Sequence, residues 1–314
     1  MTETIATRKM ERDDVDEVLE LLRVALGEPP LLKRTPELFA WKHFDNPFGE
    51  SISMVATAAD TIVGLRSFMR WQLRTPSGAL VRCARAVDTA THPAFLRRGI
   101  FRRLTEEGIE VAQSRAIDLI FNTPNAKSGS GYLSMGWTEV GPIGVLMRPT
   151  RHFLNVRGRH DTAGLPDAIE SAHWQRIPLS RAALGLRTPR TETYLNWRFG
   201  SHPTARYYKV ETESGQAVVR PNMRRGRNEL LISDLFGRDT HRAIGRAAKA
   251  TNARYIATWF SQGTPERTAA RRAGLVPMPR VTALTLMARP LRELDIDATS
   301  MSSWDLALSD LELL

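Results

Sequence analysis

One stretch of sequence decides the fold of this chain: Thr91-His-Pro-Ala-Phe-Leu-Arg-Arg-Gly-Ile-Phe-Arg-Arg-Leu104. It follows an apolar, strand-like run over residues 79–87 and opens a helical pattern, so a strand turns through a short basic loop into a helix. The first amides of a helix lack intrahelical partners and lie at the positive end of its dipole. With the guanidinium groups of Arg97 and Arg98 they suit a pyrophosphate, and Gly99 lets the backbone approach it. The stretch therefore predicts a phosphate-binding loop.

The composition narrows the class of protein. With 314 residues, of which 42% are hydrophobic and 25% charged, the chain is long enough for two globular domains. Cys83 is the only cysteine, which excludes an internal disulfide framework and is typical of a reducing compartment. No signal-peptide pattern and no run long enough to span a membrane is found, so we expect a cytoplasmic protein without a membrane partner.

The net charge of +10 allows several kinds of partner. Polyanionic small molecules, nucleic acid, or plain surface charge in an arginine-rich protein would each account for it. The seven histidines have no ligand-like spacing, and with a single cysteine no metal site is predicted. The oligomeric state is not predicted.

The residues after this helix complete an ordered set of features. An apolar strand is expected over residues 116–121, and Asn125, Tyr132 and Gly136-Trp137 follow it. The order of strand, Arg-Arg-Gly loop, helix, strand and Asn-x6-Tyr-x3-Gly-Trp resembles the GCN5-related N-acetyltransferase (GNAT) superfamily, over roughly residues 4–150.

The coenzyme A loop of that family usually reads [QR]-x-x-G-x-[GA]. At these positions the chain has Leu96, Gly99 and Phe101, of which only the glycine matches. The preceding His92 and Pro93 match the family better. The resemblance implies that the cofactor contacts three groups of residues: the end of the strand, the loop with the helix start, and an asparagine. These residues are Thr89, Ala90 and Thr91, then Leu96, Arg97, Arg98, Gly99, Ile100, Phe101 and Arg102, and finally Asn125.

The second half of the chain repeats the pattern of the first. Residues 53–70 align without a gap to residues 207–224, and both segments predict strand, turn and strand. The resemblance then implies an α/β (α+β) fold of two tandem GNAT-like domains, each a mixed, largely antiparallel twisted sheet flanked by helices. We expect the catalytic domain at residues 1–150. Residues 151–314 would hold a linker, a degenerate GNAT-like domain and a C-terminal tail that docks on one of the domains.

The two halves differ at the loop. Asp88 lies 33 residues before the end of the next strand at Phe121, but only 25 residues separate Asp234 from Trp259. The missing residues fall where the first half has its Arg-Arg-Gly loop, and Ala270 stands in place of Tyr132. We interpret the second domain as a non-catalytic one that shapes the acceptor site. A packing partner without functional groups is the alternative.

Two side chains are candidates for the chemistry. The resemblance implies that Tyr132 protonates the departing coenzyme A thiolate, and a structural tyrosine bonded to backbone is the alternative. Asp88 could act as a base through water. The second half keeps an acid at Asp234 without the loop, which suggests a structural role for Asp88 such as a turn or helix cap, and an amine that is already neutral needs no base.

These interpretations lead to one expected function. We expect an acyl-CoA-dependent N-acyltransferase, with acetyl-CoA as donor and the amine of a small molecule, such as an amino sugar or natural product, as acceptor. An aminoacyl-tRNA-dependent transferase would use the excess of arginine for RNA but has less use for the phosphate loop. A non-catalytic regulator that binds acyl-CoA is the third possibility.

Overall fold

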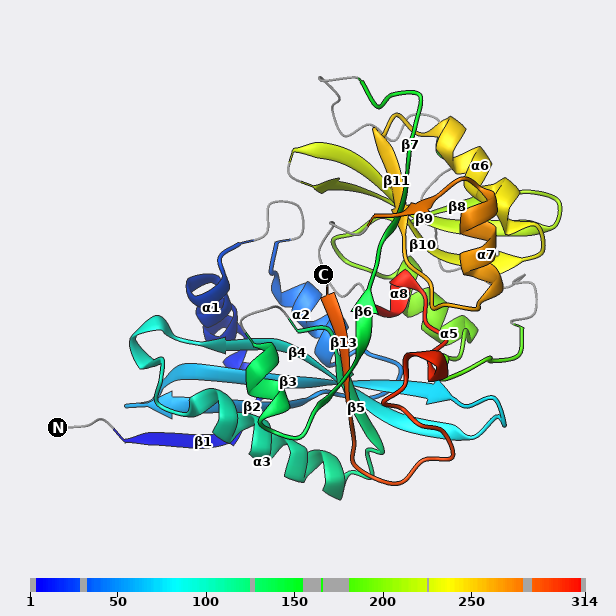
Figure 1. The fold of residues 1–314 in the computed structure, drawn as a ribbon. Coiled ribbons are helices and arrows are strands. Elements are labelled where there is room, and N and C mark those ends of the chain that lie inside the picture. The colour runs from blue at the N-terminus through cyan, green and yellow to red at the C-terminus, as the bar shows by residue number, and fades with distance from the viewer. Residues whose placement is uncertain are drawn as a thin grey trace. The chain divides into compact units, whose positions relative to one another are not determined.

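The computed structural model describes residues 4–28, 33–124, 128–154, 165, 181–224, 226–278 and 284–311. The chain divides into two compact units (Figure 1). The first unit consists of residues 1–73, 79–140 and 286–299, and the second of residues 74–78, 141–285 and 300–314.

The first unit is built on a seven-stranded mixed sheet with the order β1-β2-β3-β4-β5-β13-β6. Strands β1, β2 and β3 pair antiparallel, whereas β4 and β5 are parallel. The strands are β1 (Ile5–Lys9), β2 (Ile52–Ala58), β3 (Thr61–Arg74), β4 (Leu80–Thr91), β5 (Leu119–Asn122), β6 (Thr138–Ile143) and β13 (Leu284–Pro290). The helices are α1 (Val15–Leu26), α2 (Pro36–His43), α3 (Ile100–Ser114) and α4 (Gly129–Leu133), with short 3-10 turns at Arg12–Asp14 and Pro93–Phe95.

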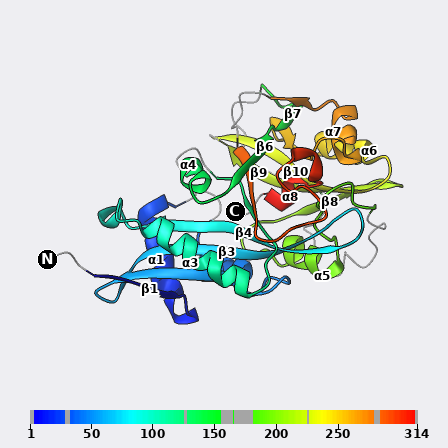
Figure 2. The same ribbon diagram turned by 60° about the horizontal axis from the view of Figure 1, so that its bottom comes forward.

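The apolar faces of α1 and α3 cover opposite faces of this sheet. Leu65 and Phe68 are three residues apart on β3, so they project to opposite sides. Leu65 packs with Leu22 of α1, and Phe68 packs with Ile109 of α3. Figure 2 shows α3 lying along the sheet. One face of each helix thus belongs to the core.

The second unit has a six-stranded sheet with the order β12-β7-β11-β10-β9-β8. Its strands are β7 (Leu146–Pro149), β8 (Tyr208–Glu211), β9 (Gly215–Arg224), β10 (Arg227–Gly237), β11 (Tyr255–Thr258) and β12 (Val276–Pro277). Its helices are α5 (Glu192–Leu195), which continues into a π-helical turn (Asn196–Gly200), α6 (Thr240–Ala250), α7 (Pro265–Arg272) and α8 (Leu308–Leu311). The hairpins β2-β3 and β8-β9 confirm the predicted strand-turn-strand repeat.

The two units exchange one strand each. β13 comes from the C-terminal half but pairs with β5 in the first sheet, and β7 follows β6 but pairs with β11 in the second. The two strands make the same contact. Arg289 donates from Nη1 to the carbonyl of Met135 (2.6 Å), and Arg148 donates to the carbonyl of Ala273. The units therefore differ from a division at residue 150, because residues 141–149 belong to the second unit and residues 286–299 to the first.

The C-terminal tail packs into the second unit, as its apolar spacing predicts. Trp304 is 1% exposed. Asp305 forms ion pairs with Arg181 and Arg187, and Asp310 forms one with Arg190. Among the described helices, none is long and apolar enough to cross a membrane.

Candidate functional site

The loop between β4 and α3 is exposed at residues 96–99 and carries two arginine side chains there, Arg97 and Arg98. The Arg97 backbone is left-handed (φ +63°), as is Gly99 (φ +76°), and helix α3 starts at the next residue. Gly99 caps the helix without a side-chain hydrogen bond, so no side chain closes the first amides of α3. The Arg98 guanidinium lies 4.7 Å from the centre of the Phe95 ring. The loop thus presents backbone N–H groups and two arginines to an anion.

The backbone of Gly99 also shows why a glycine suits this position within the protein itself. A Cβ added there would have no protein atom within 4 Å. Its φ is positive (+76°), a conformation that glycine adopts more readily than any residue with a Cβ.

Strand β4 continues past its parallel neighbour. The register between β4 and β5 runs from Cys83↔Leu119 to Arg85↔Phe121, whereas β4 itself reaches Thr91. Asp88 has a left-handed backbone (φ +39°) in the middle of this extension. The last residues of β4, among them Thr89, Ala90 and Thr91, therefore lie beyond the pairing with β5. The resemblance places the pantetheine arm at such a splay.

Asp88 is held by two neighbours on α2. Its Oδ2 accepts from Lys42 Nζ (2.9 Å) and contacts His43 Nε2 (2.9 Å), while His43 Nδ1 contacts Ser51 Oγ (2.9 Å). Burial works against the charged carboxylate, but Lys42 and His43 outweigh it and hold the pKa of Asp88 well below its usual range. Burial also lowers the pKa of His43, despite the opposing effect of Asp88. These contacts favour a positioning role for Asp88, since a carboxylate that binds protons so weakly is a poor base.

Tyr132 of α4 is buried against aromatic rings. It is 4% exposed, and its ring packs edge-on against Phe101 (5.6 Å between centres) and Trp137 (5.1 Å). Its Oη accepts a hydrogen bond from Arg66 Nη1 (2.7 Å), and the same nitrogen donates to Thr89 Oγ1. The phenol is thus tied to a side chain on β3 and, through it, to the end of β4.

Arg66 was not predicted as a site residue. The signal that could have found it is an arginine inside the apolar strand Val63-Gly-Leu-Arg-Ser-Phe-Met69, where a buried charge requires a partner.

The other residues predicted to contact the cofactor differ in burial and in their contacts. Ile100 is buried in the core beneath the loop, and Leu96 is 57% exposed. Arg102 is engaged with Glu106 (3.1 Å) and Ser134 (2.8 Å). Asn125 lies outside the described residues.

A metal site requires several clustered ligands, and a reactive thiol requires that Cys83 be accessible and readily ionised. No group of three or more His, Cys, Asp or Glu side chains in the described part of the chain could hold a metal ion. Cys83 is 0% exposed, and burial raises the pKa of its thiol well above the usual range.

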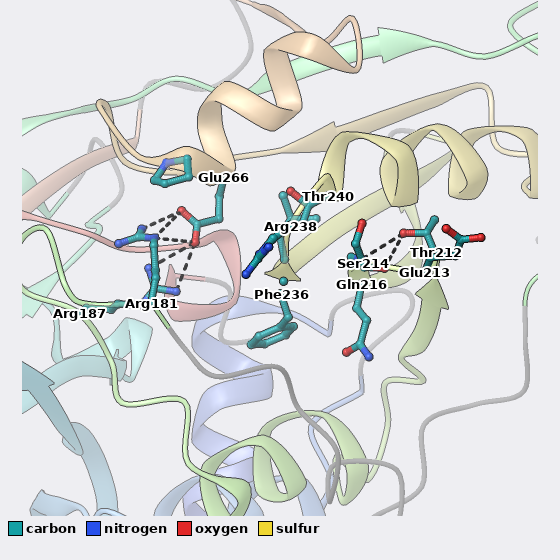
Figure 3. A pocket seen from close by; sticks show the side chains of 14 residues that line it. Arg181, Arg187, Thr212, Glu213, Ser214, Gln216, Phe236, Arg238, Thr240 and Glu266 are labelled. Carbon is teal, nitrogen blue, oxygen red and sulfur yellow. Dashed lines mark hydrogen bonds and ion pairs between the residues drawn. The ribbon is translucent and has the colours of Figure 1, made fainter.

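The second unit has a pocket at the place that corresponds to the loop. It has a volume of about 630 Å³, and its lining includes Arg238 and Thr240 at the start of α6. Figure 3 shows that Arg181 and Arg187 in its wall point at Glu266 of α7. These two arginines are thus neutralised by carboxylates, unlike the arginines of the loop in the first unit.

A sheet whose β4 extends past β5, an open start of α3 and a buried tyrosine near both are the features that the resemblance to the GNAT superfamily predicts. Residues 6–140 match the family model of the acetyltransferase (GNAT) domain. This part of the chain is a GNAT acetyltransferase domain, which indicates an acyltransferase enzyme, and the family implies an acyl-CoA co-substrate. A comparison with curated proteins finds no match.

Solved structures share the two-unit fold at low identity. A GCN5-related N-acetyltransferase from Kribbella flavida is 16% identical, with a TM-score of 0.62 over 92% of this chain and 72% of that one. Eis1 from Mycobacterium abscessus is 16% identical, with a TM-score of 0.56 over 91% of this chain and 73% of that one. N-myristoyltransferase from Saccharomyces cerevisiae, solved with bound myristoyl-CoA, is 12% identical, with a TM-score of 0.58 over 92% of this chain and 83% of that one. The tandem GNAT-like fold is therefore shared with these proteins.

Proposed function

We propose that this protein transfers an acetyl group from acetyl-CoA to the amine of a small molecule, with an amino sugar or natural product as the favoured acceptor class. One observation carries the proposal. In the first unit the splayed end of β4, the uncapped start of α3 and the phenol of Tyr132 belong to adjoining elements, and Arg66 bonds both Thr89 and Tyr132.

The residues present fit an acyl-CoA. The amides at the start of α3 have no side-chain cap, and Arg97 and Arg98 are exposed beside them, which suits the pyrophosphate. The backbone of residues 87–91 would pair with the pantetheine arm. When bound, acyl-CoA supplies the activated acyl group as a thioester.

Proton transfer is assigned to Tyr132. The hydroxyl would protonate the sulfur as the C–S bond breaks, and the amine nitrogen would form the new bond to the acyl carbon. The acceptor nitrogen loses its proton to solvent. The phenolate of Tyr132 takes up a proton from solvent and becomes a phenol again. No base is assigned, since Asp88 is committed to Lys42 and His43.

Calorimetric titration of acetyl-CoA and free coenzyme A into the wild type and Arg98→Glu tests the proposal. Charge-assisted hydrogen bonds contribute about 1.5–3 kcal/mol, so we expect at least about tenfold weaker binding in the variant. Arg238→Glu in the second unit is the matched control and should bind like the wild type. A folded wild type that binds neither ligand would contradict the proposal.

A second titration tests the length of the acyl chain on the donor. Myristoyl-CoA, the ligand of the yeast protein, is titrated beside acetyl-CoA. Tighter binding of the long chain would change the donor but not the class of reaction.

The excess of positive charge supports one second candidate, an aminoacyl-tRNA-dependent transferase. RNA binding that weakens steeply with salt, without binding of acetyl-CoA, would favour it. Tight acetyl-CoA binding without thiol release across many amines would instead favour a regulator. The role of the second unit in acceptor recognition and the cytoplasmic location stay predictions.

A further inference from the structure

Arg66 is a fully buried cation that has no carboxylate partner among the residues that the structure describes. Its exposed fraction is 0%, and within the described residues its hydrogen-bond partners are the hydroxyls of Tyr132 and Thr89. Its Nε and Nη2 have no hydrogen-bond partner there. Its guanidinium carbon lies 4.5 Å from the ring centre of Phe68 and 5.2 Å from that of Tyr132.

Such an arrangement is unfavourable for stability alone. Taking a charge out of water is expensive unless it is paired, and aromatic faces recover only part of the loss. An apolar side chain of the same length would pack at this position on β3 without that penalty. The charge therefore indicates a role at Tyr132 and Thr89.

The hydrogen bond from Arg66 limits the directions in which the Tyr132 hydroxyl hydrogen can point. A guanidinium only donates, so Tyr132 Oη accepts from Arg66 and its own hydrogen must point elsewhere. The Arg66 charge, 2.7 Å from Oη, also stabilises negative charge on that oxygen.

We infer that Arg66 is a positioning residue that aims the Tyr132 hydroxyl at the leaving sulfur and stabilises the phenolate left after proton transfer. This inference rests on the proposed function. In the step, the Oη–H bond breaks and the S–H bond forms while the C–S bond breaks. The phenolate beside Arg66 then regains a proton from solvent, which has received one from the acceptor nitrogen.

The second unit supplies a matched control. Arg220 stands at the aligned position on β9 and is also buried (3% exposed), but Ala270 replaces Tyr132 there. Because Ala270 stands at the aligned position of Tyr132, the inference assigns Arg220 no part in the proton transfer of the first unit. Arg220→Met therefore measures what loss of a buried arginine does to the protein as a whole.

The experiment is a double-mutant cycle on Arg66→Met and Tyr132→Phe. Release of the coenzyme A thiol from acetyl-CoA is followed with hydroxylamine, a small nucleophile that needs no base. We expect Arg66→Met to lower kcat about 10- to 100-fold, with acetyl-CoA KM changed less than about threefold. In the Tyr132→Phe background the same substitution should have no further effect, because Arg66 acts through the phenol. Arg66→Lys, which keeps a charge and a donor, should recover part of kcat.

Three outcomes would overturn the inference. Equal slowing by Arg66→Met in both backgrounds would mean a structural role, as would a loss matched by Arg220→Met. Unchanged kcat in Arg66→Met would mean no role. If Arg66→Met does not fold, the comparison is made with Arg66→Lys, which must lose its effect in the Tyr132→Phe background. A wild type that binds acetyl-CoA but turns over neither hydroxylamine nor other amines overturns this inference, whereas a wild type that does not bind it overturns the proposed function as well.

Discussion

Each unit has a strand that leads into a helix, and the two connections differ in length. The first runs from β4 to α3 and the second from β10 to α6. Residues 92–99 form the first, whereas only Arg238 and Asp239 form the second. Both preceding strands are irregular at an aspartate: Asp88 has a positive φ, and the register of β10 shifts between Ile232 and Asp234. The irregular strand is thus common to both units, while the phosphate loop is not.

The two aspartates, Asp88 and Asp234, differ in their ion-pair partners and in their exposure. Asp88 is paired with Lys42 and His43 of α2 and is partly exposed at a splayed strand. Asp234 is 0% exposed, pairs with Arg190 (2.8 Å) and accepts from Ser309 of the docked tail (3.0 Å). In the second unit the C-terminal tail and its ion pairs occupy the region around the aspartate. This arrangement favours a structural role for that region.

The largest effect is expected from removing the exchanged strand. A fragment of residues 1–143 lacks β13, which leaves β5 and β6 without their common neighbour. We expect it to be unfolded by circular dichroism. Fusing residues 284–299 after residue 143 through a flexible linker should restore the sheet and acetyl-CoA binding. A fragment of residues 1–143 that folds and binds alone would show that the exchange is dispensable.

Tyr132→Phe tests the phenol of the first unit, which Ala270 replaces at the aligned position of the second. Loss of a general acid slows a reaction about 10²- to 10⁴-fold, so kcat for thiol release should fall by this order while acetyl-CoA binding persists. Tyr207→Phe is the control, because Tyr207 Oη also accepts from an arginine, Arg198 (2.7 Å), but in the second unit. Similar rates in the two variants would contradict the assignment.

Asp310→Asn tests the ion pairs of the second unit. Burial raises the pKa of Asp310, but Arg190 outweighs it, so the net shift is downward and the carboxylate stays charged. Removing one partner of a buried pair costs about 3–5 kcal/mol. We expect faster hydrogen exchange in β9 and β10 and little change in β2 and β3. Glu106→Gln, which removes an exposed pair with Arg102, should change stability by less than about 1 kcal/mol.

The smallest effect is a pH dependence confined to the first unit. The folded pKa of His43 lies below its ordinary value of about 6.5. The stability linked to neutral His43 is therefore complete above that value and is lost as the pH falls towards the folded pKa. Asp88, whose pKa is lowered by Lys42 and His43, adds a further loss only below about pH 4. Hydrogen exchange of β4 should show this slope, and His43→Gln should flatten it above pH 4 without changing β10.

Much of the candidate site could be predicted from local sequence. The loop and the start of α3 at Ile100 follow from a strand pattern, a basic Gly-containing turn and a helical stripe close together in the chain. The cofactor contacts at the end of β4 and the role of Tyr132 came from the resemblance to the GNAT superfamily. Arg66 could not be predicted in this way, because its partners Thr89 and Tyr132 are distant in sequence and meet it only across the sheet. The commitment of Asp88 to Lys42 and His43 was missed for the same reason.

Periodicity and short-range turn chemistry were enough to predict two repeated sheet units and a basic loop in only one of them, whereas the acyltransferase fold came from the resemblance to the GNAT superfamily. Only the tertiary structure decided which strand completes each sheet. Leu146-Met-Arg-Pro149 and Leu286-Met-Ala-Arg-Pro290 are similar enough for either sheet, and each joins the sheet of the other half. The physical reason is that strand pairing is satisfied by any edge with the right pattern, so chain connectivity and packing, not local propensity, select the partner.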